Sequence, residues 1–298
     1  MKKLLFFTII SILFIYLLKN NYNVNDIQIA GSSTVYPITL EAEYKFMKTN
    51  PQARINVEAN GTGGGFELFT KGITQINNAS RKITNEEQEV AQNNNVKYTE
   101  YLIGRDGITI IVNQDNDWID NITKTELQEI FETNSPIKTW SDLKQTWPNK
   151  EIHLYGPTSA SGTYDFFCDT IVKQEGEQSC SLTNSMNATE NDNEIITNVS
   201  RDKYGIGFLG YAYYHENQDK VKSLAINNIP VNEQTIKSNQ YLISRPLYLY
   251  VNNEDMQNNE TLNKFIHFYL FNSQDFVKLS GYIPLTDTEI KNQQKKLI

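Results

Sequence analysis

Residues 155–167, the segment most informative about the fold, read Tyr-Gly-Pro-Thr-Ser-Ala-Ser-Gly-Thr-Tyr-Asp-Phe-Phe. A β-leaning run enters it at residues 152–155, and residues 164–172 leave it with apolar side chains at helical spacing. The small residues between these runs mark a loop that joins a strand to the N-terminus of a helix. Unpaired N–H groups, hydroxyls and Gly162 in such a loop can hold a small tetrahedral oxyanion. An ordinary helix cap with nothing bound is the alternative that this stretch alone leaves open.

Three further strand-to-helix loops of similar composition occur earlier in the chain. They read Gly-Ser-Ser-Thr-Val-Tyr-Pro (residues 31–37), Gly-Thr-Gly-Gly-Gly (residues 61–65) and Ser-Arg (residues 80–81). The glycine run does not fit the spacing of a nucleotide-binding P-loop or of a dinucleotide fingerprint. In open α/β sheets, ligands bind outside the carboxyl ends of the strands, where these loops are expected. The recurrence therefore favours an α/β fold with an anion site over four unrelated helix caps.

The composition limits the class of partner. The chain has 298 residues, of which 39% are hydrophobic, and its formal net charge is −8. This length allows two domains. The negative charge disfavours nucleic acid as a partner, so local dipoles and hydroxyls would have to hold an anion. The three histidines, His153, His215 and His267, are far apart and show no metal-ligand spacing, and no cofactor is expected.

Residues 1–24 predict a targeting segment. Lys2 and Lys3 precede an apolar run at residues 4–18, and Lys19 follows it. The pattern is typical of a secretory signal and is short for a membrane span of about 20 residues. No small-residue cleavage site is clear, so a cleaved signal peptide and an uncleaved anchor both stay open. The rest of the chain is expected in the periplasm or at the extracytoplasmic face of the inner membrane.

The two cysteines fit an oxidising compartment. Cys168 and Cys180 flank a short polar segment. A disulfide between them would close a small loop, which stabilises a fold by about 3 kcal/mol in the chain-entropy model. Two free thiols are the alternative.

Six motifs, taken in order, resemble the phosphate-binding protein of the bacterial ABC phosphate transporter. They are the three early loops, with the third extended to Asn-Ala-Ser-Arg (residues 78–81), and three later segments that read Ser-Gly-Thr-Tyr-Asp (residues 161–165), Gly-Ile-Gly-Phe-Leu-Gly-Tyr (residues 205–211) and Ser-Arg-Pro-Leu (residues 244–247). The match runs from about residue 27 to about residue 285. The resemblance implies a two-lobed periplasmic-binding-protein fold of type II, which closes on phosphate by a hinge.

The positions of these motifs predict how the lobes are assembled. Lobe 1 is expected to comprise residues 25–105 and 243–298, and lobe 2 is expected to comprise residues 106–242. The chain would then cross between the lobes twice, and its C-terminal helices would return to the first lobe.

The resemblance also implies phosphate ligands in both lobes. In the first lobe they are Ser33, Thr34, Val35, Thr62, Gly63, Ser80 and Arg81, and in the second lobe they are Ser161, Gly162 and Thr163. Arg81 is expected to supply the main positive charge, because a guanidinium group matches two oxyanion oxygens at once.

The chain departs from some members of this family at two positions. An arginine that precedes the Ser-Gly-Thr loop by four residues is replaced by Pro157, and an aspartate after the Ala-Ser pair is replaced by Arg81. The residue that accepts the phosphate proton must therefore lie elsewhere. A buried carboxylate accepts a hydrogen bond from protonated phosphate and repels sulfate, which carries no proton. Asp106 is the first candidate and Asp165 the second, with a capping or hinge aspartate as the alternative.

The expected function is capture of inorganic phosphate and its delivery to the membrane permease of an ABC transporter. The protein is expected to be a monomer that is not an enzyme and binds no nucleic acid. The alternatives are a binder of another tetrahedral oxyanion, such as sulfate or molybdate, and a surface-anchored phosphate sensor or adhesin. A serine-dependent hydrolase is disfavoured, because the sequence has no Gly-x-Ser-x-Gly elbow and its histidines suggest no base.

Overall fold

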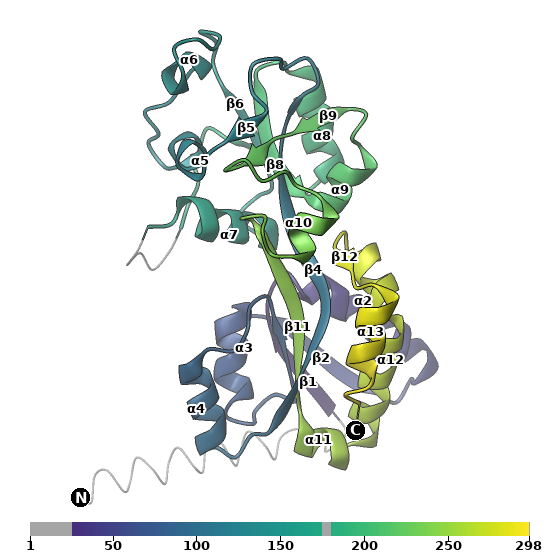
Figure 1. Ribbon diagram of the computed structural model, residues 1–298. Helices are drawn as coiled ribbons and strands as arrows, with labels where there is room; N and C mark the ends of the chain where they lie inside the picture. The colour runs from purple at the N-terminus through teal and green to yellow at the C-terminus, as the bar shows by residue number, and fades with distance from the viewer. Residues whose placement is uncertain (1–25, 175–179, 298) are drawn as a thin grey trace, which may run out of the picture. The chain divides into compact units, whose positions relative to one another are not determined.

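The computed structural model describes residues 26–174 and 180–297, so the predicted targeting segment lies outside the described residues. The chain divides into two compact units (Figure 1). Unit 1 is made of residues 26–104, 246–280 and 284–297, and unit 2 is made of Arg105–Arg245 and Gly281–Ile283. Within the described ranges, no helix is both long enough and apolar enough to cross a membrane.

The sheet of unit 1 is built around a central strand that is almost entirely buried. This strand, β1 (Asp26–Gly31), pairs in parallel with β2 (Arg54–Ala59) and β3 (Ile76–Ala79), and β11 (Ser244–Asn252) runs antiparallel to β3. The helices of this unit are α2 (Tyr36–Thr49), α3 (Gly61–Phe69), α4 (Asn85–Asn93), α11 (Asn253–Asn258), α12 (Glu260–Leu279) and α13 (Asp287–Gln294). Figure 1 shows α2 and α12 on one side of the sheet and α3 and α4 on the other, so both faces are covered.

Aromatic rings hold α12 against α2. The ring of Phe46 lies 5.3 Å from that of Phe265 and 5.5 Å from that of Phe268, measured between centroids. Burial of one such side chain stabilises the fold by about 1.5–3 kcal/mol. Helix α2 starts with Pro37 in its first turn, where the fixed φ of proline suits a helix.

The sheet of unit 2 mixes parallel and antiparallel strands. Its main strands are β4 (Tyr98–Asn113), β8 (Gly205–Gly210), β6 (His153–Gly156), β7 (Asn187–Ala188) and β9 (Val221–Ser223). Strand β6 is parallel to β8 and β7, whereas β4 is antiparallel to β8 and β9. A separate parallel pair is formed by β5 (Asn121–Ile122) and β10 (Ala225–Ile226). The helices are α5 (Lys124–Phe131), α6 (Trp140–Leu143), α7 (Gly162–Phe167), the π-helix η1 (Cys168–Val172), α8 (Asp192–Arg201), α9 (Tyr211–Glu216) and α10 (Glu233–Lys237).

The core of unit 2 joins α7 to the sheet. The ring of Phe167 stacks on that of Phe208 with centroids 4.0 Å apart, and Phe131 meets both rings edge-on. Next along the chain, Cys168 is bonded to Cys180, the pair for which the sequence predicted a disulfide. The start of η1 is therefore fixed both by packing and by a covalent bond.

The units share two long strands and one short segment. Strands β4 and β11 each run through both units, so hydrogen bonding places the strands in one order, β2-β1-β3-β11-β4-β8-β6-β7. The sequence placed residue 105 and all of residues 243–298 in the first lobe, but the structure assigns Arg105, residues 243–245 and Gly281–Ile283 to unit 2. Ile283 begins β12 (Ile283–Pro284), which pairs with β4, and its side chain is buried in the core of unit 2. Burial of Ile283 in that core is a physical reason for its place in unit 2.

Candidate functional site

Three of the predicted loops follow neighbouring strands of unit 1. Gly31 pairs with Ala59 on one side and with Asn78 on the other, so these loops start at one edge of the sheet. Gly31 has a φ of 133°, and an added Cβ there would lie 2.1 Å from the carbonyl oxygen of Asn78. A Cβ on Gly65 would lie 2.5 Å from the Cα atom of Gly31. Glycine at both positions therefore lets the start of α3 approach the end of β1.

Ser32, which was not among the predicted ligands, organises the first of these loops. Its Oγ accepts hydrogen bonds from the N–H groups of Thr34, at 3.2 Å, and Val35, at 3.4 Å. The side chains of Thr34 and Val35 are buried, and Ser33 is partly exposed. Val35 can therefore serve as an anion ligand only through its main chain.

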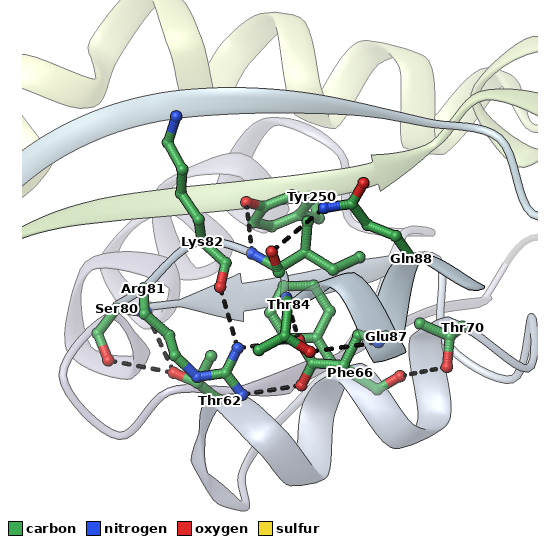
Figure 2. Close-up of polar contacts among 11 residues, drawn as sticks. Thr62, Phe66, Thr70, Ser80, Arg81, Lys82, Thr84, Glu87, Gln88 and Tyr250 are labelled. Atoms are coloured by element: carbon green, nitrogen blue, oxygen red, sulfur yellow. Dashed lines mark hydrogen bonds and ion pairs between the residues drawn. The ribbon is translucent and has the colours of Figure 1, made fainter. Parts of the chain in front are cut away.

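The second and third loops meet at a pair of hydroxyls. Thr62 Oγ1 lies 3.1 Å from Ser80 Oγ and also accepts a hydrogen bond from the N–H group of Ser80 at 3.1 Å (Figure 2). Helix α3 starts without a hydrogen bond from the side chain of its N-cap residue, Asn60. The side-chain acceptor that commonly satisfies the first N–H groups of a helix is thus missing at Thr62 and Gly63.

Arg81 is paired with a carboxylate. Its guanidinium group donates to both oxygens of Glu87, at 2.8 and 2.9 Å, and to the carbonyl oxygen of Lys82 at 3.0 Å (Figure 2). Hydrogen bonding to Glu87 raises the pKa of Arg81. Burial opposes ionisation of Glu87, but hydrogen bonds from Arg81 and Thr84 outweigh it and lower the pKa of Glu87.

This pairing bears on the expectation that Arg81 supplies the main positive charge, which stays a prediction. The Arg81 side chain is 42% exposed, and its charge is balanced by Glu87. Glu87 is held in place because it also completes the capping box of α4 with Thr84. The helix cap therefore fixes the carboxylate that neutralises the guanidinium group.

A second arginine, which sequence reasoning did not assign, lies in unit 2. Arg245 Nε and Nη2 each lie 3.1 Å from Asp106 Oδ2, and Nη2 also donates to the carbonyl oxygen of Gly162 at 3.1 Å. The two charged side chains are 14% and 1% exposed. The start of β11, the middle of β4 and the first residue of α7 thus meet at one buried ion pair. The Ser-Arg-Pro-Leu motif and the missing arginine at Pro157 were the signals for a displaced cation.

Asp106 keeps one carboxylate oxygen available. Among the described residues, its buried Oδ1 atom has no hydrogen-bond partner. Burial raises the pKa of Asp106, and the charge and hydrogen bond of Arg245, with a smaller contribution from the N–H group of Gly107, oppose this increase. An unpaired buried acceptor is costly, so a ligand that donates a hydrogen bond here would be favoured. Asp165, the second candidate, is exposed in the first turn of α7.

The predicted loop of unit 2 lies beside this ion pair. Ser161 is the N-cap residue of α7, and its Oγ accepts a hydrogen bond from the N–H group of Thr163 at 3.2 Å. Gly162 contacts Arg245 through its carbonyl oxygen. The structure therefore brings Ser161, Gly162 and Thr163 together with Asp106, and it adds Arg245. Across residues 26–174 and 180–297, no group of three or more His, Cys, Asp or Glu side chains could hold a metal ion.

Comparison with known proteins defines the class. The model of the PBP superfamily domain matches residues 20–273. A possible phosphate-binding protein from Planctomyces limnophilus superimposes with a TM-score of 0.86 at 30% identity, covering 91% of this chain and 97% of that one. An ABC-type phosphate transport receptor from Vibrio cholerae shares the fold, with a TM-score of 0.68 at 23% identity, covering 87% of this chain and 100% of that one. The fold is thus that of the superfamily's binding proteins, and the expected α/β class is confirmed.

Closer relatives identify the family. The phosphate-binding protein PstS of Staphylococcus saprophyticus is 37% identical over 272 residues, which cover 90% of this chain and 82% of that protein. The PstS protein of Staphylococcus haemolyticus is 36% identical over 274 residues, covering 90% of this chain and 83% of that protein. The chain belongs to the PstS family of phosphate-binding proteins. The resemblance read from the six motifs is confirmed.

Proposed function

We propose that this protein captures inorganic phosphate outside the cytoplasm and delivers it to the permease of an ABC transporter. Its membership of the PstS family supports the ligand and the transport role. The observation that carries the proposal is the buried Asp106–Arg245 pair beside the loop Ser161-Gly162-Thr163. The disulfide between Cys168 and Cys180 supports an oxidising, extracytoplasmic location.

Arg245 replaces Arg81 as the principal cation in this proposal. Its guanidinium group is buried, where electrostatic interactions are less screened than at the partly exposed Arg81. Because Asp106 balances its charge, hydroxyl and N–H donors must supply the rest of the binding energy. The proposed ligands with such donors are Ser33, Thr34, Val35, Thr62, Gly63, Ser80, Ser161, Gly162 and Thr163.

Asp106 selects the anion in this proposal. Phosphate that carries a proton can donate a hydrogen bond to Asp106 Oδ1, which otherwise stays buried and unpaired among the described residues. Sulfate has no proton to donate, so its oxygens would face the carboxylate directly. Leaving such a group unsatisfied costs about 1–3 kcal/mol, and more for charged groups. The site therefore favours phosphate over sulfate without any difference in size between the two anions.

Titration calorimetry of the purified protein with phosphate, sulfate and molybdate tests the proposal. We expect phosphate to bind most tightly, with one site per chain. Tighter binding of sulfate or molybdate than of phosphate would show that phosphate is not the preferred ligand. A chromogenic phosphoester should release no product, and turnover of that compound would show an enzyme. Gel filtration should show a monomer.

A further inference from the structure

The guanidinium group of Arg245 lies on the face of an aromatic ring. Its Cζ atom is 3.9 Å from the centroid of Phe166, within the range of a cation–π interaction. The edge of the same group donates to Asp106 and to Gly162. A guanidinium group is planar, so a ring against its face and acceptors at its edge together restrict its position and its orientation.

The neighbours of Phe166 explain why its ring is available for this contact. Phe167 is fully buried and stacks on Phe208, and Cys168 is bonded to Cys180. Phe166 is only partly buried and packs at the margin of the core. Two consecutive phenylalanines thus have different surroundings, one in the core and one on a cation.

The ion pair between Arg245 and Asp106 uses only one oxygen of the carboxylate. Arginine and carboxylate groups often pair bidentately, with two donors on two oxygens. Here both donors of Arg245 instead reach the single oxygen Oδ2, and Oδ1 of Asp106 has no partner among the described residues. A guanidinium group that could tilt out of its plane could bring a donor to Oδ1 instead. The ring against its face opposes that tilt.

We propose that Phe166 is a positioning residue of the anion site, which holds the Arg245 guanidinium group so that Asp106 Oδ1 stays available to a proton-donating ligand. The link to phosphate rests on the proposed function. The stacking of Phe166 on Arg245 and the pairing of Arg245 with a single oxygen of Asp106 are observed in the structure and do not depend on that function.

Binding measurements on matched variants test the role. Phe166→Leu should weaken phosphate binding about three- to thirtyfold, the range of a partly desolvated cation–π contact. It should also narrow the ratio of phosphate to sulfate affinity. Phe166→Tyr keeps the ring face, so its phosphate affinity and its ratio of phosphate to sulfate affinity should both stay near the wild-type values. Phe167→Leu is the control, because it should lower the melting temperature and leave the affinity within about twofold. Unchanged binding in Phe166→Leu, or a tyrosine variant as weak as the leucine variant, would overturn the proposal.

A second readout needs no ligand. The Nε–H group of Arg245, assigned by its absence in Arg245→Lys, should be rigid in NMR relaxation experiments on the ligand-free protein. Phe166→Leu should lower its order parameter, and Phe167→Leu should not. If the wild-type protein binds no phosphate and Phe166→Leu still lowers the order parameter, the proposed function fails and the positioning role stands. If the wild-type protein binds phosphate and Phe166→Leu leaves the order parameter unchanged, the positioning role fails alone.

Discussion

Arg245 and Asp106 are joined through one carboxylate oxygen, since Nε and Nη2 of the arginine each lie 3.1 Å from Oδ2 of the aspartate. The pair is buried, and 139 residues separate its members along the chain. The positive charge of Arg245 is balanced by Asp106, while the Oδ1 atom of Asp106 has no hydrogen-bond partner among the described residues. Recognition of an anion by a balanced pair depends on which hydrogen-bonding atoms remain, and Oδ1 is such an atom.

Removing the charge of Asp106 should change the selectivity for phosphate over sulfate more than it changes the affinity for phosphate. Asp106→Asn should lose much of the preference for phosphate, because an amide can donate to sulfate and the repulsion is gone. Competition binding of phosphate against sulfate measures this ratio. Asp165→Asn is the control and should keep the wild-type ratio. An unchanged ratio in Asp106→Asn, with a reduced one in Asp165→Asn, would reverse the assignment.

The two arginines should differ in their effect on affinity. Arg245→Ala leaves Asp106 buried and unpaired and should weaken phosphate binding by about 2–4 kcal/mol. Arg81→Ala should cost under about 1 kcal/mol, because Arg81 is partly exposed and already paired with Glu87. Calorimetry on both variants, with melting temperatures to confirm folding, measures the difference. Equal losses would show that Arg81 is as important as the sequence suggested.

The strand-to-helix loops of the candidate site could be predicted, because their chemistry is local. A strand, a run of small hydroxyl-bearing residues and a helix start are neighbours in sequence, so composition alone marked residues 161–163 and the three loops of unit 1. The cation could not be chosen in this way. Arg81 sits inside a predicted loop, and its partner Glu87 is fixed by a helix cap six residues later. Arg245 becomes part of the site only when β11 and β4 bring it to Asp106.

Reduction of the disulfide should destabilise unit 2. Cys168 and Cys180 enclose a short loop, with a sequence separation of 12, for which the chain-entropy model gives about 3 kcal/mol. The variant Cys168→Ser, Cys180→Ser should unfold at lower denaturant concentration by about that free energy. Phosphate affinity should stay near the wild-type value, since Asp106, Gly162 and Phe166 provide the contacts of Arg245 described above. The same midpoint with and without the bond would show that it does not constrain the unfolded chain.

Asp192 should make stability fall as the pH rises from about 4 to about 6. Burial, followed by the charge of Glu190, raises its pKa from 3.8 to about 6. The folded protein therefore binds a proton more readily than the unfolded chain, so this stabilising contribution is complete below pH 3.8 and lost above about pH 6. Because the side chain is only partly buried, we expect the loss to be about 1–2 kcal/mol.

Denaturant unfolding at pH 4.5 and pH 7 measures this effect. Asp192→Asn removes the titrating group and should reduce the difference between the two values. Asp275→Asn, an exposed change on α12, should keep the wild-type difference. If Asp192→Asn retains the full difference, other groups account for it.

The short segment Gly281–Ile283 means that unit 2 cannot be excised as one contiguous fragment. A polypeptide covering only residues 105–245 would lack Ile283, which is 6% exposed in the intact protein, and would lose the pairing of β12 with β4. The vacancy left by this isoleucine is worth about 1.5–3 kcal/mol of burial. A synthetic peptide that carries residues 281–283 could fill it. Unit 2 is thus suited to a two-component complementation assay. In this assay, binding of the peptide to the fragment of residues 105–245 would measure how much burial of Ile283 stabilises the unit.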